Sequence, residues 1–277
     1  MPFRVPEPPS PTALGLPERL RLLREDRAFA LLFGGYAVEL PEATLVVNER
    51  VPVPRFNYAQ DVRVSRGRTS AFLERTLEHY YQRALRPSFE LPCGLAQPEL
   101  VRALEDQGFE NHGSAPREIF AWQPQPLPEP DGRYQVRPAR EEERVAFATF
   151  YAEERFREEL VRYLDVAESH PNQGDRTVAY LALTGGEWVA AGLFHRSAYG
   201  STLHGVATAP ESRGRGAASA LVAGVLRAEG PGATLPFALS VPAGRPSPLL
   251  KLGFVPALSY DVYSLAPGRQ PSVPPQG

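Results

Sequence analysis

A short glycine-rich segment constrains this chain more than any other feature. Its residues, Arg213-Gly-Arg-Gly-Ala-Ala218, follow a stretch over 201–208 that predicts a strand, and they begin a helix expected to run from about 214 to 229. Ala217, Leu221 and Val225 recur at four-residue spacing, which gives the helix an apolar face for packing on a sheet. The chain must therefore pass from a strand into a packed helix through a tight glycine turn.

The same segment has the properties of an anion site. The first N–H groups of a helix lack partners within it and lie at the positive end of its dipole, so they attract phosphate. Gly214 and Gly216 remove side chains that would block a phosphate, and Ala217 and Ala218 keep the first turn narrow. A turn that merely connects a strand to a helix is the alternative. A Walker-type loop is excluded because no Lys-Ser or Lys-Thr follows the glycines.

The chain contains a faint internal repeat. Arg66-Gly-Arg-Thr-Ser-Ala71 resembles the segment at Arg213, and a Gly-Phe pair follows each at nearly the same distance, at Gly108 and at Gly253. Between the copies lies QPQPLPEPDG, which cannot join a helix or a central strand. The sequence thus predicts a first domain over 1–122, a proline-rich linker over 123–132, a second domain over 133–265 and a flexible tail over 266–277.

Hydrophobic periodicity predicts alternating strands and helices in both halves. In the first half, a strand at 88–91 lies between helices at 71–85 and 97–107. In the second half, strands are expected at 134–137, 177–183, 188–195, 201–208, 234–241 and 257–265, with helices at 140–156, 158–167, 214–229 and near Ser247. The fold class is therefore α/β, with an α+β type of mixed sheet in each of two tandem domains.

Composition excludes several classes of function. The 277 residues carry a net charge of −2 and no long basic run, so we expect no nucleic-acid partner. No stretch is long and apolar enough to suggest a signal peptide or a membrane span, so we expect no membrane partner and a cytoplasmic protein. Cys93 is the only cysteine and is interpreted as structural. The histidines show no metal-ligand spacing, so no metal is expected.

The segment Gly205-Val-Ala-Thr-Ala-Pro-Glu-Ser-Arg-Gly-Arg-Gly216 resembles the strand and loop of the GNAT superfamily of N-acetyltransferases, whose core is Q/R-x-x-G-x-G/A. Arg213, Gly216 and Ala218 fill the defining positions. Leu249-Leu-Lys-Leu-Gly-Phe254 is similar to the helix with a final Gly-Phe pair found downstream in the family. The resemblance spans about 134–265. With the repeat, it implies a tandem-GNAT arrangement whose N-terminal unit is degenerate, because Thr69 stands where the second copy has Gly216.

The resemblance implies an acetyltransferase that moves an acetyl or short acyl group from acetyl-CoA to an amine of an unidentified small molecule or peptide. The backbone of Val206, Ala207 and Thr208 would hold the pantetheine arm and polarise the thioester. The pyrophosphate would bind the loop formed by Arg213, Gly214, Arg215, Gly216, Ala217 and Ala218. A non-catalytic acyl-CoA-binding or regulatory module is the alternative, and the oligomeric state, including a homodimer, stays open.

Candidates for proton transfer are weaker. The family's common general acid is a tyrosine at the position of Leu249, so this chain lacks it. His204 is a candidate base, with a packed strand residue as the alternative. Tyr260 and Ser247 are candidate acids, with strand packing for Tyr260 and a helix N-cap before Pro248 for Ser247 as the alternatives. Three arginines on the predicted helices, Arg155, Arg157 and Arg162, could bind a carboxylate on the acceptor or line a solvated helix face.

Overall fold

A computed structural model describes residues 15–93, 96–111, 117–152, 154–169, 176–230, 237–242 and 248–265. The first half contains α1 (Leu16–Leu31), β1 (Tyr36–Glu39), β2 (Thr44–Val47), η1 (Pro54–Phe56), β3 (Tyr58–Gln60), α2 (Thr69–Tyr81), β4 (Ser88–Pro92), α3 (Pro98–Asp106), β5 (Phe109–Asn111) and β6 (Arg117–Trp122). The second half contains β7 (Gln135–Pro138), η2 (Glu141–Glu143), α4 (Arg144–Tyr151), α5 (Glu154–Ser169), β8 (Arg176–Thr184), β9 (Glu187–Arg196), β10 (Ser201–Thr208), η3 (Pro210–Ser212), α6 (Ala217–Glu229), β11 (Phe237–Pro242), η4 (Pro248–Leu252) and β12 (Phe254–Leu265). The mixed α/β prediction is confirmed.

The two halves repeat the same arrangement of strands. In the first half, β1, β2 and β3 pair antiparallel, and β3 then pairs parallel with β4 after the crossover through α2. In the second half, β8, β9 and β10 pair antiparallel, and β10 pairs parallel with β11 after the crossover through α6. The repeat predicted from Arg66 and Arg213 is therefore a repeat of structure, with each arginine in the crossover loop of its own unit.

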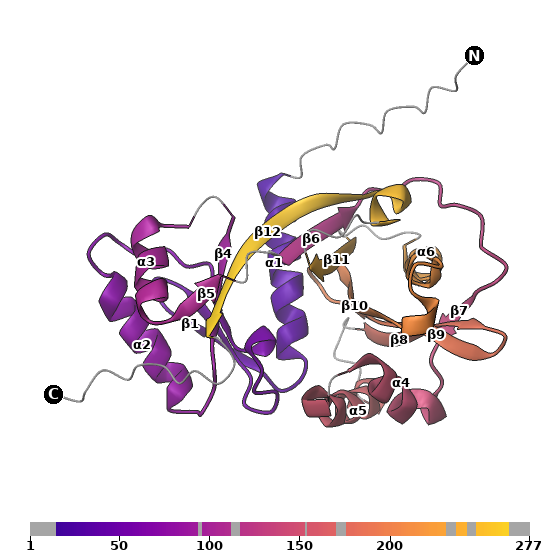
Figure 1. Ribbon diagram of the computed structural model, residues 1–277, viewed down its shortest axis with the longest axis horizontal. Helices are drawn as coiled ribbons and strands as arrows, with labels where there is room; N and C mark the ends of the chain where they lie inside the picture. Colours follow the sequence, from indigo (N-terminus) through magenta and orange to yellow (C-terminus); the bar gives the residue numbers. More distant parts are fainter. Residues whose placement is uncertain are drawn as a thin grey trace, which may run out of the picture.

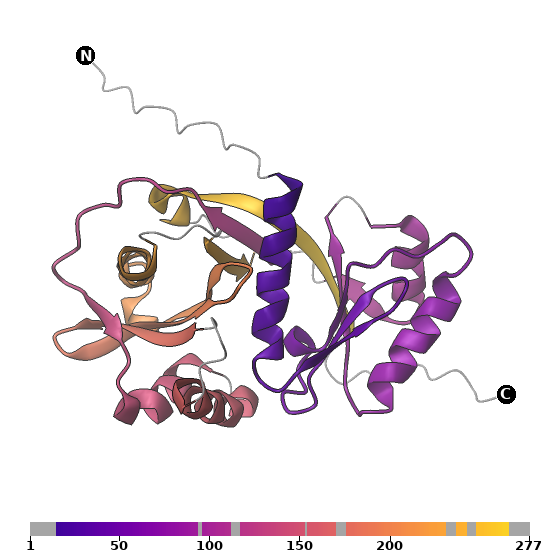
Figure 2. The same ribbon diagram turned by 180° about the vertical axis from the view of Figure 1, so that it is seen from behind.

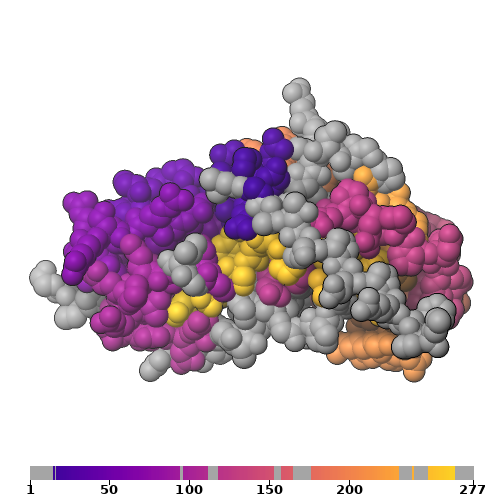
Figure 3. All heavy atoms as spheres, turned by 90° about the horizontal axis from the view of Figure 1, so that it is seen from above, coloured from indigo at the N-terminus to yellow at the C-terminus, as the bar shows by residue number. Residues whose placement is uncertain are grey.

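The units also exchange strands, which joins them into one 12-stranded sheet. Strand β6 belongs to the first half but pairs with β11 and β12 of the second. The end of β12 pairs with β4 and β5 of the first half. This long strand arches across both units in Figure 1, and in Figure 3 its yellow atoms lie between the purple and the orange parts. The segment 123–132 thus connects two units that each complete the sheet of the other.

Helix α1 lies between the two units (Figures 1 and 2). It contacts β2 and η1 of its own half and β10 of the other half. Its residues Phe29, Ala30 and Phe33 join a buried cluster that also contains Leu160 of α5 and Leu193 of β9. The shared apolar core makes α1 part of both units.

Helix α6 packs as its sequence predicts. Ala217, Leu221, Val222, Val225 and Leu226 are all buried in one core cluster with residues of β8, β9, β10 and β11. At its C-terminal end, the buried Glu229 accepts a hydrogen bond of 2.6 Å from the hydroxyl of Tyr180 and forms an ion pair of 2.9 Å with Arg176. Both ends of α6 are consequently held against the sheet, and the preceding glycine loop has a fixed platform.

Several predicted boundaries differ from the structure. The helix expected at 140–156 is divided: α4 ends at Tyr151, and Ala152 has extended backbone angles. No glycine or proline marks this break, so the periodicity runs through it. The helix expected from 214 begins at Ala217, because Gly214 and Gly216 both have left-handed backbone angles. The strands expected at 177–183 and 188–195 are joined by a hairpin turn at Gly185-Gly186, where both glycines have positive φ as a type I′ turn requires. Within the described residues, no helix has the length and apolarity needed to cross a membrane.

Candidate functional site

A gap opens in the sheet between β10 and β11. The two parallel strands pair from Ser201 with Phe237 to His204 with Ser240. Beyond His204, the register of β10 shifts at Gly205, whose φ is +57°, and among the described residues Val206 to Thr208 pair only with β9. The shift is a β-bulge, a feature that bends a strand away from its neighbour. Within the part of the chain that the structure describes, this edge of β10 has no partner strand from Val206 to Thr208.

The alternation of backbone groups identifies which residues face this gap. Ala209 donates its N–H to the carbonyl of Val189, on the side of β9, at 3.0 Å. Because successive residues of a strand direct their polar groups to opposite sides, Ala207 also faces β9, whereas Val206 and Thr208 face the gap. Of the three residues predicted to hold a pantetheine arm, two thus offer backbone N–H and C=O groups to the gap.

The glycine loop closes one end of the gap. Gly214 and Gly216 have φ values of +72° and +93°, which explains why glycine is needed at both positions. A Cβ at either position would have no atom within 4 Å, so the space beside the loop is open. In the part of the chain that the structure describes, the N–H groups of Gly214, Gly216, Ala217 and Ala218 have no hydrogen-bond partner. The loop and the start of α6 therefore form a concave set of donors for an anion.

Two contacts that the sequence did not reveal fix this loop. The hydroxyl of Tyr134 donates a hydrogen bond of 2.7 Å to the carbonyl of Arg215. Since C=O and N–H point in opposite directions across one planar peptide, this contact turns the N–H of Gly216 away from Tyr134. Arg213 Nε donates to the carbonyl of Thr208 at 3.3 Å, which places its guanidinium between the loop and the gap. Tyr134 lies far from the loop in sequence, so no local signal indicated it.

A cavity of about 450 Å³ lies at the other end of the gap. Its second-half wall consists of Tyr151, Ala152 and the strand segment from Gly205 to Ala207. Its first-half wall consists of residues from α1 and from the turn around η1: Phe29, Val53, Pro54, Arg55 and Phe56. A small molecule in this cavity would contact both units and the bulged part of β10.

Tyr151, the last residue of α4, supports the bulge. Its hydroxyl donates a hydrogen bond to the carbonyl of His204, and a Cβ on Gly205 would lie 2.8 Å from that hydroxyl. Only glycine therefore fits beneath the tyrosine. Burial raises the pKa of Tyr151 to about 12, with Arg55 acting in the opposite direction, so the hydroxyl stays a proton donor at neutral pH.

Solved structures of known family share this architecture. A GCN5-related N-acetyltransferase from Kribbella flavida is 19% identical, with a TM-score of 0.65 over 93% of this chain and 98% of that one. Another from Sphaerobacter thermophilus is 18% identical, with a TM-score of 0.60 over 93% and 96%. A tandem GNAT protein from the clavulanic acid biosynthesis pathway is 16% identical, with a TM-score of 0.54 over 82% and 79%. No family model and no curated protein matches the sequence.

The chain has a tandem GNAT fold. The fold expected from the segment at Gly205 to Gly216 is thus confirmed, together with the presence of two units.

The candidate base of this GNAT fold is packed behind the cavity wall. His204 is 1% exposed, and its imidazole stacks on the ring of Phe29. Phe29 lines the cavity, whereas His204 is not among the lining residues. Proton transfer between His204 and a molecule in the cavity would therefore need a movement of Phe29. The role of His204 as a base stays a prediction.

The candidate acids lie elsewhere. Tyr260 is 2% exposed and packs with Leu22, Ile119 and Ala121. Its strand, β12, is three strand spacings from β10, or about 14 Å. Ser247 lies outside the described residues. Leu249, which replaces the tyrosine of the family pattern, is buried in the core beside α6. The geometry thus does not bring Tyr260 to the gap, and the assignment of both candidate acids stays a prediction.

The first GNAT unit lacks the complete glycine loop. Gly67 has a φ of +75°, close to that of its counterpart Gly214. Thr69, however, is the first residue of helix α2 and is 4% exposed, whereas its counterpart Gly216 precedes α6 in a left-handed conformation. The first loop therefore does not adopt the backbone shape of the second, as expected of a degenerate copy.

The remaining residues considered in the sequence analysis are Cys93 and the three arginines of the helices before β8. The thiol of Cys93 lies 3.1 Å from the hydroxyl of Ser259, and burial raises the pKa of this thiol. Arg162 forms an ion pair with Glu159 on its own helix. Arg157 is half-buried, and the side chain of Arg155 lies outside the described residues. Across the described ranges, no cluster of three or more His, Cys, Asp or Glu side chains is arranged to hold a metal ion.

Proposed function

We propose that this protein transfers an acetyl or short acyl group from acyl-CoA to an amine. One observation carries the proposal: the free edge of β10 leads from a set of unpaired loop N–H groups to a cavity. An extended pantetheine arm would lie along Val206 and Thr208, with its pyrophosphate at Gly214 to Ala218 and its thioester at the cavity. The GNAT fold of the chain agrees with this placement.

The chemistry is a direct transfer within a ternary complex. The neutral amine attacks the thioester carbon, a C–N bond forms, and the C–S bond breaks as the carbonyl is restored. Backbone N–H groups beside the bulge, such as that of Val206, would stabilise the negative charge that develops on the carbonyl oxygen. The proton lost by the amine reaches the departing thiolate or water. Since Tyr260 is packed in the core away from the cavity, water would deliver the proton to the sulfur.

A second function, binding of acyl-CoA without turnover, has one observation in its favour. Leu249 occupies the position of the family's tyrosine acid and is buried in the core. A regulatory module that keeps the CoA site but has lost catalysis would show this replacement. Binding alone cannot separate the two functions, whereas release of free CoA thiol in the presence of an amine separates them.

The proposed cofactor site is tested by matched substitutions in the two loops. Gly214→Asp and Gly67→Asp each place a carboxylate at a left-handed position with no atom near the new Cβ. Both should lower stability similarly, by about 1 kcal/mol. Only Gly214→Asp should repel the pyrophosphate, so calorimetry with acetyl-CoA should show an affinity loss of roughly tenfold or more for this variant alone. Equal affinities of the two variants for acetyl-CoA would contradict the assignment of the pyrophosphate site to the second loop.

A further inference from the structure

The cavity at the bulge of β10 carries information about the acceptor, provided that the proposed acyl transfer is correct. The thioester would reach the cavity at Gly205 to Ala207, so the amine must approach from the remaining walls. Those walls include Phe29 and the turn from Val53 to Phe56, all from the first unit. The unit with the degenerate loop therefore builds the surface that an acceptor meets.

The described part of this surface carries a positive charge and no negative charge. Among the described lining residues, Arg55 is the only side chain that is charged at neutral pH, and none carries a carboxylate. The other ionisable group, the phenol of Tyr151, is neutral there. Arg55 is exposed, and its guanidinium has no ion pair or hydrogen bond within the described chain. It is thus available to an anionic group of a ligand.

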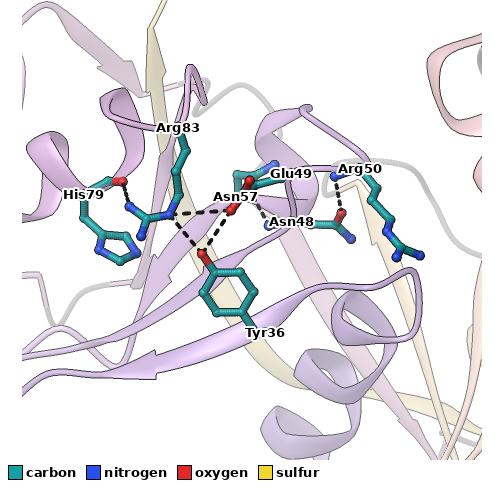
Figure 4. Close-up of polar contacts among 7 residues, drawn as sticks. All are labelled: Tyr36, Asn48, Glu49, Arg50, Asn57, His79 and Arg83. Carbon is teal, nitrogen blue, oxygen red and sulfur yellow. Dashed lines mark hydrogen bonds and ion pairs between the residues drawn. The ribbon is translucent and has the colours of Figure 1, made fainter.

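Two fully buried asparagines, Asn48 and Asn57, hold the turn that carries Arg55. Figure 4 shows both of them, with Arg50 beside Asn48. Asn48 Oδ1 accepts hydrogen bonds from the backbone N–H of Arg50 at 3.0 Å and of Val51 at 2.9 Å. Asn57 Nδ2 donates to the carbonyls of Val51 and Val53 at 2.9 and 3.0 Å. Asn57 Oδ1 accepts from the N–H of Asn48 at 2.8 Å. The two side chains thus bind backbone groups between Asn48 and Val53, which holds the chain that leads into η1.

The base of the same turn is fixed from β4. Ser88 Oγ donates to the carbonyl of Pro54 at 3.1 Å, and the N–H of Ser88 donates to the carbonyl of Asn57 at 2.9 Å. Arg55 therefore projects from a preorganised 3-10 turn, and little backbone freedom would be lost on ligand binding.

This arrangement discriminates between amines. An alkyl amine is mostly protonated in neutral solution, and such a cation would meet the positive charge of Arg55, with no carboxylate among the described lining residues to compensate it. An amine that also carries a carboxylate would gain charge-assisted hydrogen bonds from the guanidinium. The rest of the first-unit wall, Phe29, Val53, Pro54 and Phe56, is apolar and suits a hydrocarbon or aromatic group. We propose that the acceptor is an amino carboxylate of amino-acid size with an apolar side chain, and that Arg55 binds its carboxylate.

Product analogues test this proposal without requiring turnover. N-acetyl-L-phenylalanine and N-acetyl-L-phenylalaninamide differ only in the negative charge that Arg55 would bind. Calorimetric titration of the full chain, with and without CoA, should show that the acid binds roughly tenfold tighter than the amide. Arg55→Gln should remove this preference by weakening the acid alone. Arg55→Lys should retain part of it, because lysine keeps the charge but loses the two-pronged geometry.

Arg66→Gln is the matched control, since Arg66 is equally exposed but lies in the first loop. It should leave both affinities unchanged, and all three variants should unfold at the wild-type temperature. The proposal is overturned if acid and amide bind equally, if neither binds, or if Arg55→Gln keeps the preference. A separate titration with acetyl-CoA tests the proposed function. If acetyl-CoA does not bind but the acid still binds more tightly than the amide, the proposed acyl-CoA site is wrong and Arg55 is still an anion site.

Discussion

The ring of Phe29 stacks on the imidazole of His204, with centroids 3.3 Å apart and planes inclined by 12°. Phe29 belongs to α1 of the first unit, and His204 is the last residue of β10 before the bulge. The contact therefore joins the first unit to the point where the sheet opens, and Phe29 also lines the cavity. Through this pair, the degenerate unit contributes directly to the cavity in which we propose that the acceptor binds.

Substitution Phe29→Leu tests this role. The smaller side chain should uncover His204 and enlarge the cavity, which should raise KM for the acceptor and leave the Kd for acetyl-CoA unchanged. Phe72→Leu is the matched control, because Phe72 is also buried but belongs to α2 and packs in the core of the first unit. Both variants should lose about 1–2 kcal/mol of unfolding free energy. Identical acceptor kinetics in the two variants would show that Phe29 has only a packing role.

Substitution Tyr151→Phe removes the hydroxyl that binds the carbonyl of His204. That carbonyl would then be buried without its partner at the bulge, so stability should fall by about 1–3 kcal/mol. Turnover at saturating acetyl-CoA should also fall, because the bulge directs the backbone groups that hold the thioester. Urea unfolding and steady-state kinetics measure the two effects. Unchanged values in both experiments would contradict the proposed support of the bulge.

Acid should destabilise the interface between the units through His195. Burial lowers the pKa of this histidine to about 4, although the carboxylate of Glu25 lies 4.0 Å from its Nε2. In the unfolded chain, His195 has a pKa of about 6.5, so between pH 6.5 and 4 it is protonated there but stays neutral in the folded protein. The free energy of unfolding therefore falls as the pH drops from about 6.5 towards 4. This histidine should account for a loss of about 2 kcal/mol between about pH 7.5 and pH 5.

Urea unfolding of the wild type and His195→Gln at both pH values measures that contribution. The variant should lose less stability on acidification than the wild type, whatever its stability at neutral pH. The same loss in both proteins would assign the pH dependence to other groups.

Substitution Tyr134→Phe removes the hydrogen bond to the carbonyl of Arg215. The peptide that carries the N–H of Gly216 would lose its orientation, so we expect acetyl-CoA to bind about three to ten times more weakly. Tyr199→Phe is the control, because the hydroxyl of Tyr199 has no hydrogen bond within the described residues. Equal affinity in both variants would mean that the loop holds its shape without Tyr134.

Local sequence signals predicted the elements around the loop well. The glycine turn at 214 and 216 and the apolar stripe of α6 were both predicted, and the structure contains both. The break after Tyr151 was missed, because the chain there contains no glycine or proline. Strands β1, β2 and β3 were missed as well, since they are short and lie among prolines and charged residues.

The rest of the site depends on contacts between distant segments. Tyr134 reaches Arg215, Tyr151 reaches His204, and Phe29 and Arg55 enter the cavity from the other unit. The exchange of β6 and β12 between the units has the same character, because only the pairing of distant strands defines it. No periodicity or motif within one segment encodes such contacts.

Turnover of acetyl-CoA is the direct test of the proposed acyl transfer to an amine. Release of free CoA thiol should be followed with a panel of amino acids, their amides, polyamines, aminoglycosides and peptide N-termini, for the wild type, Gly214→Asp and Gly67→Asp. We expect amine-dependent thiol release by the wild type and Gly67→Asp, and its loss in Gly214→Asp. Tight binding of acetyl-CoA without thiol release for any amine would contradict acyl transfer and leave a binding module.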